Sequence, residues 1–185
     1  MAGHRAQSLW VGCYVVIVIL AGPSGSGKTA VGIILAARLG WIFEDTDALH
    51  TPAQIAKMHA GVPLTDADRW PWLETVAAWM DQKIGAGESA AVACSALKRA
   101  YRDFFRQGRP AVRIVILEVD QQTLAARLTG RLDHFFPASL LQSQLADLEM
   151  PDDTEPTLVV SATLTPAEMA DEIMRDLGLT APPHG

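Results

Sequence analysis

Short apolar runs alternate with longer segments of helical pattern along most of the chain. This alternation is typical of an α/β fold in which a parallel sheet is covered by helices on both faces. The apolar runs predict five strands, at residues 14–20, 41–44, 90–95, 112–118 and 157–161. The intervening segments predict helices at residues 28–39, 52–60, 69–84, 98–107, 120–129, 138–148 and 166–177.

Two of the predicted helices begin with clear capping signals. The sequences TPAQ, residues 51–54, and TPAE, residues 165–168, each place a threonine before a proline at the first helical position. The threonine hydroxyl can accept a hydrogen bond from the third helical residue, and the glutamine or glutamate there can bond back to the cap. We therefore expect a capping box at both starts.

The chain has 185 residues, enough for one domain with a full core. We expect a single domain over residues 13–179, between flexible tails at residues 1–12 and 180–185. The apolar stretch from Leu9 to Ala21 follows a basic start, so it also resembles a secretory signal peptide, although it is too short for a transmembrane helix. Its β-branched run VVIVIL leads into a glycine loop, which favours a buried first strand.

The charge balance restricts the possible partners. Fifteen basic and 21 acidic residues give a formal net charge of −6, which argues against a general nucleic-acid binder. An anionic ligand must therefore be bound by local positive charge. The two cysteines, Cys13 and Cys94, form no disulfide framework and no C-x-x-C pair, so we expect a reducing, cytoplasmic setting.

The most specific motif is GPSGSGKT, residues 22–29, between a predicted strand and a predicted helix. It fits the pattern G-x-x-x-x-G-K-[ST], in which backbone N–H groups and the helix N-terminus bind phosphate. Lys28 can reach the β- and γ-phosphates of ATP, and the Thr29 hydroxyl can ligate Mg²⁺. We assign ATP binding to Gly22, Ser24, Gly25, Ser26, Gly27, Lys28, Thr29 and Ala30.

Two segments compete to supply the acidic partner of this loop. Asp120 ends RIVILEVD, where it is either the second acidic motif of an ATPase or, as we favour, the N-cap of the next helix. Asp45 and Asp47, in FEDTDALH, follow the second strand, and alternation in an extended segment would point them the same way. One of two carboxylates near a metal-bound triphosphate can join the magnesium shell while the other accepts a proton from an acceptor hydroxyl, and we take Asp45 as a magnesium ligand through water. A solvated acidic turn is the alternative.

Basic residues gather in a few further segments of the chain. Lys57 and Arg69 lie in KMHAGVPLTDADRWPWLE, where Arg69 beside two aspartates could also be a surface ion pair. Lys98 and Arg102 are i, i+4 neighbours after the third strand, which favours an anion between them over a solvated face. Eight of the fifteen basic residues lie in the phosphate loop and these segments, and we take this to indicate an anionic acceptor: Lys28, Lys57, Arg69, Lys98, Arg99, Arg102, Arg127 and Arg131.

Five blocks together resemble the P-loop gluconate kinases, relatives of shikimate and nucleoside monophosphate kinases. They are GPSGSGKT, DTDALH, KMHAGVPLTDADRWPWL, CSALKRAYRD and HFFPASLLQSQLADLE, in family order over residues 15–150. The resemblance implies a three-layer P-loop kinase fold with a five-stranded parallel sheet and a small mobile lid at about 127–140. It also implies phosphorylation of D-gluconate at its 6-hydroxyl with ATP and Mg²⁺, in a homodimer that binds neither nucleic acid nor membrane.

The same resemblance implies the roles of individual residues. Asp47 looks like the base that contacts the acceptor hydroxyl, and with Lys28, Arg127 and Arg131 it makes up the catalytic set. Arg127 also meets the ATP phosphates, and the loop at 161–163 lies where relatives hold adenine. The implied acceptor-binding residues are Asp47, His50, Lys57, Met58, Arg69, Trp72, Ser95, Lys98, Arg102 and His134.

Two other functions remain open at this point. A kinase of the same fold could act on another small hydroxy acid such as shikimate, although KMHAGVPLTDADRWPWL speaks against it. A non-catalytic nucleotide sensor would have kept the loop and lost acceptor residues, whereas Asp47, Lys57, Arg69 and Arg102 are all present.

Overall fold

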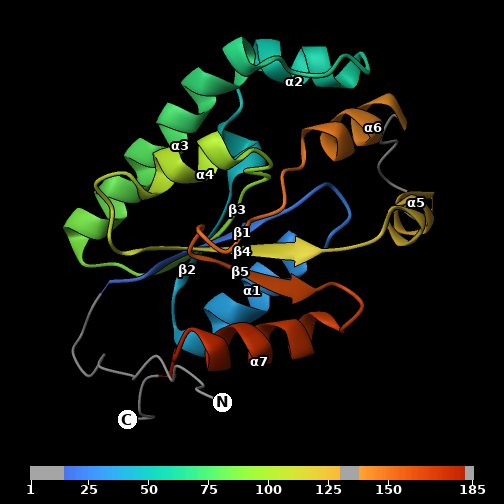
Figure 1. Ribbon diagram of the computed structural model, residues 1–185. Coiled ribbons are helices and arrows are strands. Elements are labelled where there is room, and N and C mark those ends of the chain that lie inside the picture. Colours follow the sequence, from blue (N-terminus) through green and yellow to red (C-terminus); the bar gives the residue numbers. More distant parts are fainter. Residues whose placement is uncertain (1–14, 130–137, 182–185) are drawn as a thin grey trace.

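The computed structural model describes residues 15–129 and 138–181 (Figure 1). The predicted N-terminal tail, most of the predicted lid, Arg131 and His134 lie outside these residues. Within them the chain forms a five-stranded parallel sheet of order β2-β3-β1-β4-β5. The strands are β1 (Ile17–Ala21), β2 (Ile42–Asp45), β3 (Ala90–Ala93), β4 (Val112–Glu118) and β5 (Thr157–Ser161).

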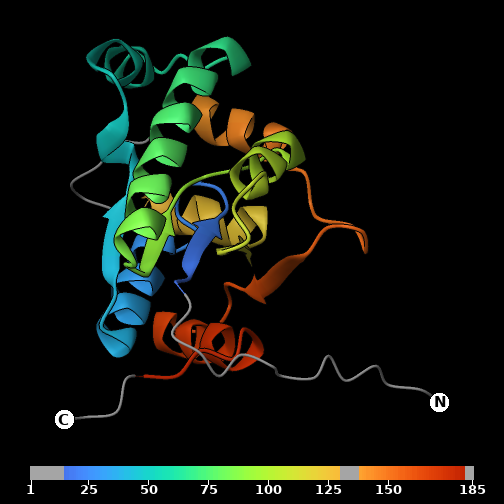
Figure 2. The ribbon, with the colours of Figure 1, turned by 90° about the vertical axis from the view of Figure 1, so that its left-hand side faces the viewer.

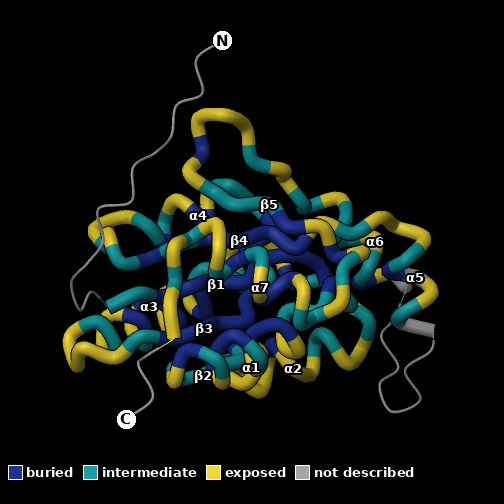
Figure 3. Tube along the Cα trace, turned by 90° about the horizontal axis from the view of Figure 1, so that it is seen from below, coloured by how far each residue is buried: buried dark blue, intermediate teal, exposed yellow. Residues whose placement is uncertain are grey.

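All five predicted strands are confirmed. The apolar run before the glycine loop is the central strand, and all five residues of β1 are buried. Figure 3 shows this burial, with the middle of the sheet dark blue and exposed positions on the helices and loops around it. A strand that pairs on both sides and is covered on both faces must be apolar throughout, which explains the VVIVIL pattern.

The helices also follow the prediction, with differences at their ends. A 3₁₀ turn, η1 (Thr46–Leu49), was not predicted. The α-helices are α1 (Lys28–Leu39), α2 (Pro52–His59), α3 (Asp66–Ala86), α4 (Arg99–Arg106), α5 (Gln121–Thr129), α6 (Ala138–Asp147) and α7 (Pro166–Asp176). None of the helices in the described ranges is long and apolar enough to cross a membrane.

Local side-chain chemistry sets several of these helix ends. The capping boxes of Thr51 with Gln54 and of Thr165 with Glu168 are confirmed. Helix α3 begins three residues before the predicted start at 69, because Thr65 and Asp68 form a third capping box. Asp120 is confirmed as a cap, since its carboxylate accepts hydrogen bonds from the backbone N–H and hydroxyl of Thr123.

Two hydrophobic cores lie on the two faces of the sheet, and alternate residues of each strand supply them. Figures 1 and 2 show α3 and α4 over one face and α1 and α7 over the other. On the first face Ile17 and Ile19 pack with Leu73 of α3 and Phe105 of α4. On the second, the buried residues of the core include Val18, Leu20, Leu35, Leu117, Met169 and Ile173.

The close approach of α1 to β2 requires a glycine. A Cβ atom on Gly32 would lie 2.4 Å from a ring carbon of Phe43, which is nearer than real Cβ contacts allow. The absence of a side chain at Gly32 thus lets α1 pack closely against β2. Because β1, β2 and β3 are parallel neighbours, their carboxyl ends meet at one edge of the sheet, the position where open α/β sheets bind ligands.

Candidate active site

The phosphate loop joins β1 to α1 at this edge. Gly22, Gly25 and Gly27 have φ angles of 135°, 85° and 101°, which only glycine adopts without strain. A Cβ atom on Gly22 would also lie 3.0 Å from Ser26 Oγ and 3.1 Å from the Leu117 carbonyl oxygen. The loop thus has the close-packed glycine backbone that a phosphate cradle needs.

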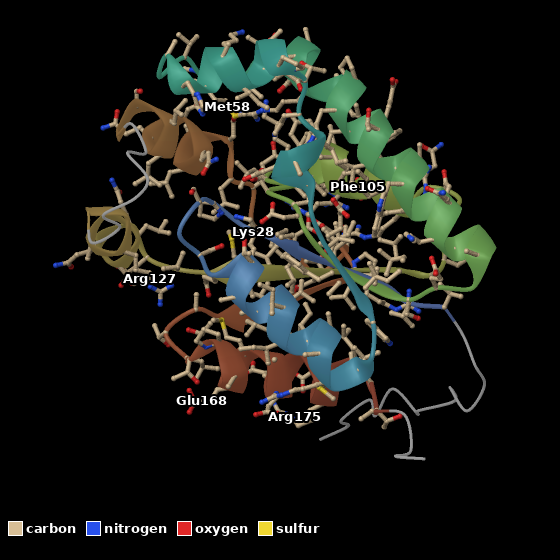
Figure 4. The ribbon with its side chains drawn as sticks, turned by 180° about the vertical axis from the view of Figure 1, so that it is seen from behind. Lys28, Met58, Phe105, Arg127, Glu168 and Arg175 are labelled. Atoms are coloured by element: carbon tan, nitrogen blue, oxygen red, sulfur yellow. The ribbon has the colours of Figure 1, made fainter. Side chains whose placement is uncertain are left out.

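The start of α1 suits a bound anion. Its N-cap is Gly27, and no side chain caps it, so the first N–H groups of the helix and its positive dipole end can act on a phosphate. The Lys28 ammonium lies over the loop, where it donates hydrogen bonds to the carbonyls of Gly22 (3.0 Å) and Pro23 (2.9 Å). In Figure 4 Lys28 stands at the start of α1, with Arg127 to one side and Met58 above it.

Thr29 and Asp45 meet as a magnesium site would require. The Thr29 hydroxyl donates to Asp45 Oδ2 over 2.9 Å. Hydroxyl and carboxylate oxygens are hard ligands that fit Mg²⁺, which usually takes few protein ligands and adds phosphate and water oxygens. Among the described residues there is no group of three or more His, Cys, Asp or Glu side chains that would form an all-protein metal site.

The predicted extended geometry of Asp45 and Asp47 is wrong. The chain leaves the strand after Asp45, whose Oδ1 accepts the Asp47 N–H over 3.2 Å and so starts η1. Aspartate often forms such a turn with the backbone two residues on. Asp45 therefore faces Thr29, whereas Asp47 stands on the turn with its side chain 80% exposed.

Buried neighbours hold this turn rigidly. The Thr46 hydroxyl donates to the Ala93 carbonyl at the end of β3, and the Trp72 indole N–H donates to the Thr46 carbonyl, both over 2.9 Å. His50 stacks on Trp72 with ring centroids 4.3 Å apart and an interplanar angle of 13°. Asp47 is thus placed by groups from β3 and α3, and its carboxylate lies 3.9 Å from His50 Nε2.

A pocket with a volume of about 120 Å³ joins this turn to the phosphate loop. Eight of the predicted site residues line it, namely Ser24, Lys28, Asp47, His50, Met58, Arg69, Trp72 and Ser95. Sequence reasoning missed the other lining residues, which are Pro63, Leu64, Ala96, Leu97, Tyr101, Leu140, Ser143 and Gln144. The pocket has apolar walls with convergent polar groups, as small-molecule sites commonly do.

Gln144 of α6 is the missed residue that contacts the phosphate loop directly. Its Oε1 accepts the backbone N–H of Ser24 over 2.7 Å. The two residues are 120 positions apart, so no local pattern could have linked them. Gln144 lies in the block HFFPASLLQSQLADLE, and membership of that family block was the one sequence signal that could have pointed to it.

Several of the predicted cationic residues already have carboxylate partners. Arg69 lies in the pocket and pairs with Asp147 of α6 over 2.7 Å. Lys98 pairs with Asp66 over 2.7 Å, and Lys57 pairs with Asp68. Lys57 and Lys98 are not among the residues that line the pocket, so their predicted contact with the acceptor remains a proposal.

The prediction that Arg102 binds the acceptor is wrong. Arg102 is fully buried, and all five of its N–H donors bond within the protein. Two go to the Glu155 carboxylate at 2.6 and 2.8 Å, and the others go to the carbonyls of Ala96, Leu97 and Glu149. The prediction that Lys98 and Arg102 share an anion is also wrong, because Lys98 pairs with Asp66 and Arg102 pairs with Glu155.

Arg127 lies on the other side of the phosphate loop. Its guanidinium donates to the Gly25 carbonyl over 3.3 Å and to the Ala162 carbonyl over 2.6 Å, which links the loop to the end of β5. A second pocket, of about 410 Å³, lies there. Its lining has the apolar character that an adenine ring requires and consists of Gly25, Gly27, Ala126, Arg127, Leu164, Pro166 and Met169. These residues adjoin the predicted adenine loop at 161–163.

Comparison with known proteins agrees with this geometry. A family model described as an AAA domain matches residues 17–151. The chain is 45% identical to a gluconokinase of Gluconobacter oxydans, over 95% of this chain and 97% of that protein. It is 43% identical to the thermosensitive gluconokinase of Escherichia coli, over 76% of this chain and 75% of that protein.

The chain belongs to the gluconokinase family. A solved gluconokinase from Sinorhizobium meliloti superposes with a TM-score of 0.79 at 40% identity, covering 89% of this chain and 93% of that one. A sugar kinase from Janibacter gives a TM-score of 0.84 at 42% identity, covering 89% and 95%. A shikimate kinase from Aquifex aeolicus, at 15% identity and a TM-score of 0.55, shares the three-layer P-loop kinase fold.

Replacing Arg102 should destabilise the protein strongly. Arg102→Met leaves the Glu155 carboxylate buried beside only one arginine, so we expect the free energy of unfolding to fall by about 3–5 kcal/mol. Arg106 also pairs with Glu155 but is partly exposed, and Arg106→Met should cost less. Urea unfolding of the three proteins measures the order, and an Arg102→Met midpoint equal to that of wild type would contradict the buried role.

Protonation of His50 should destabilise the fold. Burial lowers the pKa of His50 below its ordinary value of 6.5, so the unfolded chain binds more protons between the two values. Stability therefore falls as the pH drops below 6.5. Urea unfolding at about pH 7.5 and about pH 5.5 should show a smaller loss for His50→Gln than for wild type. An equal loss in both proteins would show that His50 is not the group responsible.

Proposed function

We propose that this member of the gluconokinase family transfers the γ-phosphoryl group of ATP to the 6-hydroxyl of D-gluconate, giving 6-phosphogluconate and ADP. One observation carries the proposal. Lys28 and Ser24 of the phosphate loop line the same pocket as Asp47, His50 and Arg69. A phosphoryl donor on the loop and a small acceptor in the pocket would lie next to each other, as phosphoryl transfer requires.

The loop and Arg127 would hold the nucleotide. The backbone N–H groups at the start of α1 and the Lys28 ammonium would bind the phosphates, and the pocket beside Arg127 would take the adenine. Thr29 and Asp45 fit Mg²⁺, Asp45 through a water molecule. When bound, the ion would neutralise charge on the phosphates. The roles of Arg131 in catalysis and of His134 in acceptor binding are proposals that rest on the family resemblance.

Asp47 would act as the general base. In the transfer the acceptor hydroxyl oxygen bonds to the γ-phosphorus, the bond from that phosphorus to the β–γ bridging oxygen breaks, and the hydroxyl proton passes to the Asp47 carboxylate. The hydrogen bonds of Thr46 and Trp72 would hold the backbone of η1, and with it the Cα of Asp47, beside the acceptor. His50, which burial keeps neutral, can exchange hydrogen bonds with acceptor hydroxyls.

The acceptor carboxylate would lie at the Arg69 end of the pocket. Arg69 is the arginine that lines it among the described residues, and a guanidinium binds a planar carboxylate through two parallel N–H donors. The 6-hydroxyl, at the other end of the acceptor, would then lie beside Asp47, which lines the same pocket. We further propose that the protein is a homodimer and that it lies in the cytoplasm. The molecular mass in solution tests the dimer, since one chain has a mass of 19.9 kDa.

The Asp47→Asn variant tests the proposed reaction. We expect phosphorus NMR to detect 6-phosphogluconate with the wild-type protein, ATP and Mg²⁺. The rate should fall by about 10²- to 10⁴-fold in the variant, because the amide cannot accept the proton. ATP affinity should be unchanged, since Asp47 stands on the acceptor side. Asp171→Asn, at an exposed carboxylate of α7 that pairs with Arg38, is the matched control, and a fully active Asp47→Asn would exclude this base.

The Asp45→Asn variant tests the proposed magnesium site. Asparagine can still accept the Asp47 N–H and start η1, but it removes the charge that faces Thr29. We expect the Mg²⁺ concentration for half-maximal rate to rise several-fold while the KM for gluconate stays the same. A magnesium titration of initial rates measures both quantities. An unchanged magnesium requirement would place the ion elsewhere.

A further inference from the structure

The arginine at the acceptor end of the pocket already binds a carboxylate of its own chain. Arg69 Nη1 lies 2.7 Å from Asp147 Oδ2, with the two side chains 12% and 24% exposed. Asp147 is the last residue of α6, and the same helix lines the pocket with Leu140, Ser143 and Gln144. The carboxylate therefore comes from a wall of the pocket and lies on the group that an acidic acceptor would need.

The charges at this end of the pocket are already balanced. Lys98 Nζ lies 3.5 Å from Asp147 Oδ1 and 2.7 Å from Asp66 Oδ1, and the Tyr101 hydroxyl donates to Asp66. Two cations thus face two carboxylates. A third carboxylate added to this cluster would meet repulsion from Asp147 at short range, in a partly buried place where screening is weak.

We propose that Asp147 is an internal competitor of the acceptor and sets its affinity: the acceptor carboxylate replaces the Asp147 carboxylate on Arg69. The inference rests on the proposed function, in that it takes the acceptor to be a sugar acid. Asp147 is a positioning and affinity-setting residue and does not touch the transferred phosphoryl group. Its side chain is partly exposed, so it can turn into solvent when the acceptor carboxylate arrives.

The Asp147→Asn variant tests the exchange. Asparagine keeps the size of the side chain and loses the charge, so gluconate no longer displaces an ion pair. We expect the KM and the Kd for gluconate to fall by about two- to fivefold, the ratio that one partly exposed ion pair represents. The KM for ATP should stay the same, because the contact lies at the acceptor end. D-glucitol, in which a hydroxymethyl group replaces the carboxylate of gluconate, should bind wild type and variant equally in calorimetry.

Asp66→Asn is the matched control. Asp66 carries the same charge beside the same lysine, but its hydrogen bonds go to Lys98 and Tyr101. This variant should leave the Kd for gluconate within about twofold of wild type. An equal gain in gluconate affinity in both variants would mean that removing any negative charge near the pocket has this effect. It would overturn the exchange at Arg69.

Other outcomes separate this inference from the proposed function. A gluconate Kd that is unchanged or higher in Asp147→Asn would overturn the inference, since the ion pair would then only hold α6 in place. If wild type bound gluconate without phosphorylating it, the proposed function would fail, and the calorimetric Kd would still decide the role of Asp147. If wild type bound no gluconate, both would fail.

Discussion

A backbone hydrogen bond fixes the phosphate loop against the loop that follows β3. The Gly22 N–H in the phosphate loop donates to the Ser95 carbonyl over 3.0 Å, one step beyond the bond from Cys94 N–H to the Leu20 carbonyl in the β1–β3 ladder. The loop after β1 and the loop after β3 therefore leave the sheet in fixed register. Because β2 adjoins β3 on its other side, Asp45 and η1 reach the same edge. The phosphate loop, the proposed magnesium ligands and the proposed acceptor pocket all depend on this strand order.

The loop after β3 needs support of its own. Ala96 has a φ angle of 39°, the one positive value at a residue other than glycine among the described residues. Such a conformation is strained and persists when the surroundings hold it. Arg102 does so by donating to the carbonyls of Ala96 and Leu97, and its own charge is compensated by Glu155. Arg102 therefore supports Ala96 and Leu97, which line the pocket, and does not itself contact a molecule bound there.

The sequence allowed the fold and the conformation of the glycine loop to be predicted, because their signals are local. The strand pattern, the glycine spacing of the loop and the capping threonines each act over a few residues, and each was confirmed. The roles of Arg102 and Lys98 depend on partners far away in the chain, Glu155 for the first and Asp66 for the second. A sequence shows that an arginine is charged, but the fold decides which carboxylate neutralises it. The family resemblance could not correct the prediction for Arg102, because it assigns a role to a residue without showing which side chains that residue contacts.

The central claim is that the pocket between the phosphate loop and η1 selects a sugar acid as phosphoryl acceptor. Initial rates of ADP release with Mg·ATP, compared for D-gluconate, shikimate, glycerate and a nucleoside monophosphate, test it most directly. We predict that kcat/KM for gluconate exceeds that for the other three by orders of magnitude. A higher kcat/KM for any other acceptor would leave the phosphate machinery intact and contradict our account of Asp47, His50 and Arg69. ADP release from none of them would contradict the assignment as a kinase of small acceptors.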